Sequence, residues 1–237
     1  MIVNDISKIN LIDKFGNAIP QKKISNDYNS IAEITKNNKF KKLIFLLIEN
    51  NYESIIFYLS LLKSQNAIVL LNSNITTDNL YKLIGVYKPD TIITKKNIEI
   101  KNYSEIFKLE NYYCIECNKK NNHKINKELF FLLTTSGSTG SSKFVRISYQ
   151  NVKANTKSIV NFLNINKNDK LITTLPPDYT YGFSLLNTHL FKESTIIIND
   201  YSVLQREFWE LLNKTKATTF GGVPYTFELL RKIRFEN

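Results

Sequence analysis

Residues 134–143 combine seven hydroxyl side chains, two glycines and one lysine in the order Thr-Thr-Ser-Gly-Ser-Thr-Gly-Ser-Ser-Lys. Glycines let backbone N–H groups form a concave anion-binding nest, hydroxyl groups donate to phosphoryl oxygens, and lysine neutralises negative charge. The composition therefore predicts a phosphate-binding loop. It is not a Walker A loop, because Gly137 and Gly140 lie three residues apart and Phe144 follows Lys143 where that motif has Ser or Thr.

A flexible Ser- and Gly-rich linker is the alternative interpretation of this loop. Two apolar segments border it, residues 129–133 and 145–147, and strands this close in sequence should pair with each other. Five of the seven glycines of the chain lie between residues 137 and 222, which indicates close backbone approach there. The linker is therefore the weaker interpretation.

Apolar runs and helical patterns alternate between residues 43 and 94. This βαβαβ order requires right-handed crossovers and a largely parallel sheet with helices on its faces. The predicted elements are a strand at 43–48, a helix at 51–63 capped by Asn50 or Asn51, a strand at 67–71, a helix from Thr76 or Thr77 to Pro89, and a strand at 91–94.

Residues 95–128 are rich in Lys and Asn and show weak periodicity, so we interpret them as a connecting stretch between two lobes, residues 1–125 and 126–237. After the loop and its two strands, Ser148 is expected to cap a helix that extends to Leu163. The remaining predicted elements are strands at 171–175, 195–198 and 218–220 and helices at 204–212 and 225–233.

Composition excludes several classes of protein. A chain of 237 residues with 43% hydrophobic and 22% charged residues is expected to fold as a globular protein. The net charge of +11 comes from lysines scattered among asparagines with little Arg, so no nucleic-acid partner is expected. Glu49 and Glu53 interrupt the most apolar stretch, which argues against a membrane span, and no secretion signal is visible at the start.

The few cysteine and histidine residues suggest neither a metal site nor a hydrolase. Cys114 and Cys117 form one pair where zinc sites need more ligands, so we expect two reduced thiols in a surface loop and a cytoplasmic protein. His189 has no Ser or Asp partner at a telling spacing, and we expect a packed or surface histidine.

The loop resembles the phosphate-binding core motif of the adenylate-forming superfamily, which includes acyl-CoA synthetases, luciferases and the adenylation domains of peptide synthetases. The resemblance continues through Glu49-Asn50, residues 87–90, residues 175–182 and residues 221–224. It implies an α/β fold that corresponds to part of the large N-terminal domain, with mostly parallel βαβ sheet layers flanked by helices. Ser142 and Phe144 depart from the usual Pro and Gly of the motif.

By this resemblance, the protein would use Mg²⁺ and ATP to convert a small-molecule carboxylate into an acyl adenylate and pass the acyl group to a thiol of CoA or of carrier-protein pantetheine. The residues implied to bind the β- and γ-phosphates are Thr135, Ser136, Ser138, Thr139 and Lys143, with Gly137 and Gly140 permitting the loop geometry. The residues implied to line the acid pocket are Tyr179, Tyr181, Gly182, Gly221 and Gly222. Both tyrosines could instead serve packing. Asp178 could hold an ammonium group, although an exposed turn aspartate is the simpler expectation.

Members of the superfamily are usually about twice this length, and the motifs expected further along, including the C-terminal catalytic lysine, are not present in these 237 residues. The chain is therefore expected to be an ATP-dependent ligase present as an N-terminal fragment or as one part of a split enzyme with a complementary C-terminal fragment. The alternative is a non-catalytic nucleotide-binding remnant. On either interpretation we expect the isolated chain not to complete adenylation. The sequence does not identify the acid or its acceptor.

Overall fold

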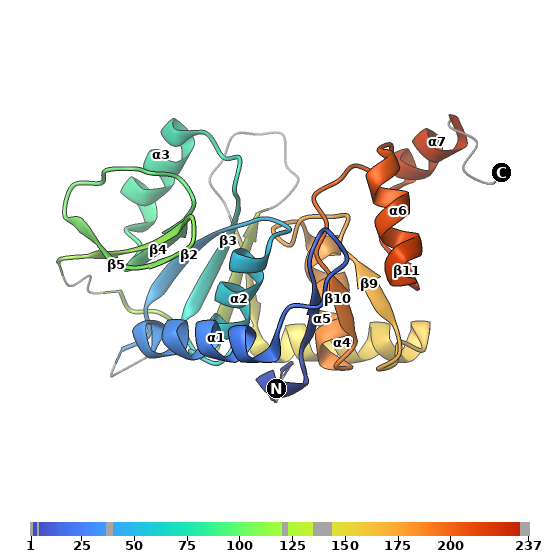
Figure 1. Cartoon of the computed structure of the whole chain (residues 1–237). Coiled ribbons are helices and arrows are strands. Elements are labelled where there is room, and N and C mark those ends of the chain that lie inside the picture. The colour runs from blue at the N-terminus through green and yellow to red at the C-terminus, as the bar shows by residue number, and fades with distance from the viewer. Residues whose placement is uncertain (1, 4, 37–39, 120–122, 135–143, 233–237) are drawn as a thin grey trace. The chain divides into compact units, whose positions relative to one another are not determined.

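The computed structural model describes residues 2–3, 5–36, 40–119, 123–134 and 144–232 (Figure 1). The chain forms two compact units. Unit 1 comprises Met1–Ser25, Asn50–Tyr52 and Ala154–Asn237, and unit 2 comprises Asn26–Glu49 and Glu53–Lys153. These units differ from the predicted lobes, because the strands at both ends of the loop pair into the sheet of unit 2.

Unit 2 is built on a mixed sheet of seven strands in the order β5-β6-β4-β2-β3-β7-β8. Strands β2, β3, β4 and β7 run parallel, whereas β5, β6 and β8 pair antiparallel with their neighbours. The strands are β2 (Leu43–Ile48), β3 (Ala67–Asn72), β4 (Thr91–Thr94), β5 (Tyr103–Leu109), β6 (Tyr112–Cys117), β7 (Leu129–Thr134) and β8 (Phe144–Ser148). The predicted βαβαβ order is confirmed at its centre.

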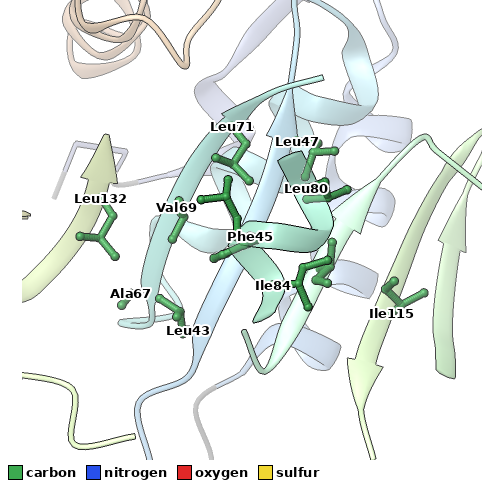
Figure 2. Close-up of a cluster of buried hydrophobic side chains, with 12 residues drawn as sticks. Leu43, Phe45, Leu47, Ala67, Val69, Leu71, Leu80, Ile84, Ile115 and Leu132 are labelled. Carbon is green, nitrogen blue, oxygen red and sulfur yellow. The ribbon is translucent and has the colours of Figure 1, made fainter. Parts of the chain in front are cut away.

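One face of this sheet packs on helix α3 (Thr77–Tyr87) through a continuous apolar cluster (Figure 2). Alternate residues of β2, such as Phe45, point to this face because side chains of a strand alternate between faces. Thr76 caps α3 by accepting from the Asn79 N–H, as predicted, and Lys88 ends the helix in the left-handed conformation.

Helix α2 (Tyr52–Leu61) packs on the opposite face. Phe131 of β7 points away from the α3 cluster, and its ring stacks on Tyr58 of α2 with centroids 5.9 Å apart. Helix α1 (Gln21–Thr35) lies next to α2, where the Ser60 hydroxyl donates to the Tyr28 carbonyl at 3.2 Å. Strand β2 is therefore buried on both faces, which explains its uninterrupted apolar sequence.

Two predictions for residues 95–128 were wrong. The segment contains the antiparallel hairpin β5–β6, which extends the sheet beyond β4. Because β5 is an edge strand whose side chains are mostly exposed, its polar composition hid the strand pattern. Cys114 and Cys117 lie on β6 rather than in a surface loop, and Cys114 is buried.

Unit 1 is built on a parallel sheet of four strands in the order β1-β10-β9-β11. The strands are β1 (Asn10–Ile12), β9 (Lys170–Ile172), β10 (Thr195–Ile197) and β11 (Thr219–Phe220). Helices α5 (Thr180–Phe191), α6 (Arg206–Thr215) and α7 (Pro224–Lys232) accompany them, with a short 3-10 turn η1 (Ile6–Lys8) before β1. Phe208 and Leu211 of α6 pack on Ile172 and Ile197 of the sheet.

Helix α4 (Tyr149–Leu163) begins in unit 2 and continues into unit 1. Its start is capped as predicted, because the Ser148 hydroxyl accepts from the Asn151 N–H at 3.1 Å while Asn151 Oδ1 accepts from the Ser148 N–H at 3.0 Å. Strand β9 is shorter than the predicted strand at 171–175. Among the described helices, none is long and apolar enough to cross a membrane.

Candidate functional site

The hydroxyl-rich loop leaves the sheet of unit 2 between β7 and β8. The two strands pair antiparallel, and Thr134 lies opposite Phe144 at the base of the loop. The pairing predicted for the bordering strands is therefore confirmed. All seven predicted phosphate-binding residues, Thr135, Ser136, Gly137, Ser138, Thr139, Gly140 and Lys143, lie outside the described residues, and their role stays a prediction.

The base of the loop is held by packing. The Phe144 ring meets the Tyr87 ring of α3 edge to face with centroids 5.0 Å apart, an arrangement favoured between aromatic rings. At the other end of β8, the Ser148 and Asn151 hydrogen bonds fix the start of α4. Strand β8 is thus anchored at both ends by the elements on either side of it.

The carboxyl ends of β2, β3, β4 and β7 lie along one edge of the sheet, because these strands are parallel. The loop starts at this edge. Strands β3 and β4 lie on opposite sides of β2. The direction in which successive strands are added to the sheet therefore reverses between the neighbouring strands β2 and β4. In open α/β sheets, ligands bind outside the carboxyl ends of the strands at such a reversal.

A polar network at this edge joins three strand ends. Glu49, directly after β2, accepts from the Lys95 ammonium and from the Ser73 hydroxyl, each at 2.5 Å. Ser73 and Lys95 directly follow β3 and β4. Sequence reasoning missed this network, although the signal was available as one polar residue after each apolar strand. The network ties the strand ends together and balances the charge of Lys95.

Tyr179 and Tyr181 lie in unit 1 at the start of α5, and both rings are about two-fifths exposed. The Tyr179 N–H donates to the Pro176 carbonyl in a turn at 3.1 Å. Because both side chains reach solvent, they are not core residues and could contact a ligand. Asp178 differs from the expected exposed turn residue, since it is only 9% exposed.

Gly182 is buried where no larger residue fits. A Cβ atom at this position would lie 2.3 Å from the Pro176 carbonyl oxygen and 2.6 Å from that of Leu175. Both contacts are to backbone and are far shorter than real Cβ contacts. Gly182 therefore lets the first turn of α5 lie directly on the backbone of residues 175–176, in the segment after β9 (residues 173–179).

Gly221 and Gly222 follow β11 in unit 1. A Cβ atom on Gly221 would lie 2.1 Å from Cδ1 of Leu185, and one on Gly222 would lie 2.9 Å from Cε2 of Phe227. The Thr174 hydroxyl donates to the Gly221 carbonyl at 2.6 Å and joins the β11 end to the segment after β9. Gly221 thus lies against Leu185 of α5, the helix that also contains Gly182.

A small cavity lies within unit 1 between α5 and the segment after β9. Its volume of about 10 Å³ is roughly the room of one water molecule. Its lining consists of Asn50, Leu171, Thr173, Thr174, Leu175, Pro177, Gly182, Leu185 and Leu186. The Asn50 carboxamide oxygen is buried and has no hydrogen-bond partner. Of the two residues predicted to cap α2, Asn50 or Asn51, Asn50 is therefore not the one that caps through this oxygen.

His189 of α5 is a core residue, one of the two expected alternatives, and is fully buried. Its Nδ1–H donates to the Leu185 carbonyl at 2.9 Å, and its Nε2 is buried without a partner. Burial lowers the pKa of His189, against smaller opposing effects of the Leu185 carbonyl and the Asp169 carboxylate. The folded chain therefore favours neutral imidazole.

The lowered pKa predicts a pH-dependent stability. Above the ordinary pKa of 6.5, His189 is neutral in both states; below it, the unfolded chain binds the proton more readily. We expect the midpoint of thermal unfolding to fall as the pH is lowered from about 7.5 to about 5.5, and the fall to be smaller in His189→Gln. His123→Gln is the control, since His123 is only half-buried. An equal fall in both variants would exclude His189 as its origin.

The described residues contain no group of three or more His, Cys, Asp or Glu side chains able to hold a metal ion. Burial raises the pKa of the Cys114 thiol to about 12 and also raises the pKa of Tyr103. The Cys114 thiol is therefore protonated at neutral pH and is a poor metal ligand or nucleophile.

The sequence pattern of the family described as AMP-binding enzyme matches residues 34–237. A 2-succinylbenzoate–CoA ligase of Lactococcus lactis subsp. lactis (strain IL1403) is 24% identical over an alignment of 217 positions, and the match covers 86% of this chain and 48% of that ligase. The chain thus spans about half the length of this relative.

Solved structures show the same fold. Apo MatB from Rhodopseudomonas palustris matches with a TM-score of 0.71 and 18% identity, covering 97% of this chain and 49% of MatB. The O-succinylbenzoate coenzyme A synthetase MenE from Bacillus subtilis, solved in complex with AMP, matches with a TM-score of 0.71 and 18% identity, covering 95% of this chain and 60% of MenE. The predicted α/β fold, corresponding to part of the large domain, is confirmed.

Proposed function

Because the chain belongs to the AMP-binding enzyme family, whose members are adenylate-forming ligases, we propose that it binds the ATP phosphates and the acid in a carboxylate-activating reaction. The observation that carries this proposal is the closed base of the hydroxyl-rich loop at the carboxyl edge of a parallel sheet, where Thr134 pairs with Phe144. Loops at such edges bind nucleotide phosphates in open α/β sheets.

The loop supplies donors and positive charge. In our proposal, Thr135, Ser136, Ser138 and Thr139 donate hydrogen bonds to the β- and γ-phosphates of ATP, and Lys143 neutralises their charge. Gly137 and Gly140 let backbone N–H groups approach the phosphates. Magnesium would be supplied as the Mg-ATP complex, where it would neutralise part of the phosphate charge.

The reaction is an in-line displacement. A carboxylate oxygen of the acid attacks the α-phosphorus, the bond from that phosphorus to the bridging oxygen breaks, and pyrophosphate leaves with the electron pair. Donors and cations that stabilise charge on the departing pyrophosphate lower the barrier. A thiol then attacks the acyl carbon, releases AMP and gives its proton to solvent.

The acid-binding residues of the proposal lie in unit 1. Tyr179 and Tyr181 are exposed at the start of α5, and the proposal keeps Gly182, Gly221 and Gly222 as residues that line the acid pocket; a Cβ at each of them would collide with neighbouring protein atoms. The relatives named as CoA ligases support CoA as the acyl acceptor, and pantetheine on a carrier protein is the second acceptor of the proposal. The proposal places the protein in the cytoplasm and assigns it no nucleic-acid partner. Its proposed protein partner is a complementary C-terminal polypeptide.

The test is acid-dependent exchange of labelled pyrophosphate into ATP over a panel of carboxylic acids. The assay uses the 237-residue chain alone and mixed with the product of an adjacent reading frame, because the relative of known activity is about twice as long. We expect exchange in the mixture and little in the chain alone. Exchange in neither sample, with every acid of the panel, would contradict the proposed function.

A further inference from the structure

The cavity between α5 and the segment after β9 is lined by a residue whose side-chain oxygen has no hydrogen-bond partner. Asn50 is one of the residues that line it, and the Asn50 carboxamide oxygen is buried without a hydrogen-bond partner. A buried acceptor that has lost water and gained no protein donor destabilises the fold. Native structures keep such atoms rarely, and each requires an explanation such as a water molecule, an ion or a functional role.

Asn199 of unit 1, which is buried as a whole residue, shows the contrast with the half-buried Asn50. Asn199 is 1% exposed, and its Nδ2 donates to the carbonyls of Thr173 and Tyr201 at 2.9 and 3.0 Å. Its Oδ1 accepts from the Tyr201 N–H at 3.1 Å. Both the nitrogen and the oxygen of the Asn199 side chain thus have hydrogen-bond partners within the protein. The Asn50 oxygen has none and can accept from a donor that enters the cavity.

Leu185 limits the size of the cavity. Its side chain lines the space, and its Cδ1 lies so close to Gly221 that a Cβ there would be 2.1 Å away. Gly182, on the same wall, could not carry a side chain without striking backbone. The Leu185 side chain is therefore the flexible part of the wall next to Gly182 and Gly221. A shorter side chain at this position would enlarge the cavity without a shift of the backbone.

We propose that this cavity is the inner end of the acid-binding pocket, that Leu185 limits the length of the acid, and that Asn50 accepts a hydrogen bond from a hydroxyl group on the acid. The proposal rests on the proposed function and deepens it, because it commits to short hydroxylated carboxylic acids as the substrate class. Leu175, Pro177 and Leu186 supply the apolar remainder of the wall. In the unliganded chain, a single water molecule fits the volume and can donate to the same oxygen.

The test measures binding of acids to the 237-residue chain by ligand-observed saturation-transfer NMR, which needs no turnover. The panel is butyrate, its 2-, 3- and 4-hydroxy derivatives, and hexanoate. We expect one hydroxybutyrate to bind about tenfold more tightly than butyrate, because a site built to hydrogen-bond a hydroxyl discriminates against its absence. Asn50→Leu should abolish this preference, and Leu185→Ala should improve hexanoate relative to butyrate by about tenfold.

Thermal unfolding separates a binding role of Asn50 from a structural one. We expect Asn50→Leu to keep the unfolding midpoint of the wild type, because no hydrogen bond to Oδ1 is lost. The matched control Asn199→Leu removes the hydrogen bonds of Asn199 and should lower the midpoint clearly. Equal loss in both variants would show a structural Asn50 and overturn the inference.

The outcomes also distinguish the inference from the proposed function. Acids that bind with unchanged preferences in both cavity variants would overturn the inference and leave the proposed function standing. Binding of none of the acids would overturn the inference, and the pyrophosphate-exchange assay with its wider panel then decides the proposed function separately. A hydroxyl preference that survives Asn50→Leu would exclude Asn50 as the acceptor.

Discussion

Lys143→Ala, assayed in the complete enzyme that includes the complementary C-terminal polypeptide, is expected to slow acid-dependent pyrophosphate exchange by about 10²-fold, the usual effect of removing one group that stabilises charge in a transition state. In the proposed reaction, charge develops on the departing pyrophosphate, and Lys143 is the only cation within residues 134–143. Because the assay runs the reaction in both directions, it reports the chemical step without the thiol.

Two further variants make this result interpretable. Lys157→Ala removes an exposed lysine of α4 and should leave the exchange rate unchanged. Lys143→Arg keeps the charge with a different shape and should retain part of the activity. An exchange rate in Lys143→Ala equal to that of the wild type would remove Lys143 from the site.

Gly182→Ala should destabilise unit 1 by about 3 kcal/mol or more, at the upper end of overpacking effects. The added methyl group would overlap two backbone carbonyl oxygens, those of Pro176 and Leu175, and neither can move without disturbing the turn before α5. Thermal unfolding followed by circular dichroism should show a midpoint about 6–12 °C lower.

Gly85→Ala is the matched control for this substitution. Gly85 lies within α3, where a Cβ would meet nothing within 4 Å. Alanine in a helix interior is more stable than glycine by about 0.5–1 kcal/mol, so the midpoint should rise slightly. A Gly182→Ala protein as stable as the wild type would show that α5 does not lie against the 175–176 carbonyls.

The centre of unit 2 was predictable because its signals are local. Leu43–Ile48 and Ala67–Asn72 are short apolar runs, and burial on both faces permits no alternation. Thr76 and Ser148 cap helices by contacts within three residues. The hydroxyl-rich loop stands out in the sequence for a similar reason, since its candidate phosphate-binding groups lie in one uninterrupted segment.

Elements at exposed positions were harder to predict. Helix α1 was missed although Ile24, Tyr28, Ile31 and Thr35 are buried at helical spacing, because polar residues separate them. Strand β5 was missed because its exposed edge position allows a polar sequence, and an irregularity between Glu105 and Phe107 breaks its period.

The polar features of the site depend on contacts between distant parts of the chain. Glu49, Ser73 and Lys95 meet only because β2, β3 and β4 are parallel neighbours. Asn50 joins the cavity with residues more than a hundred positions later, such as Thr173 and Leu185. No spacing rule within a single segment reveals such contacts, so they could be identified only from the three-dimensional structure.

The central claim, phosphate binding by residues 135–143, is tested most directly by NMR of the chain labelled with ¹⁵N-glycine and titrated with Mg-ATP. The chain has seven glycines, and glycine-to-alanine variants assign their signals. Our account predicts saturable shifts of the Gly137 and Gly140 amides, with Gly16 and Gly85 unmoved, and weaker shifts in Lys143→Ala. Loop signals that stay in place at millimolar ATP would contradict it.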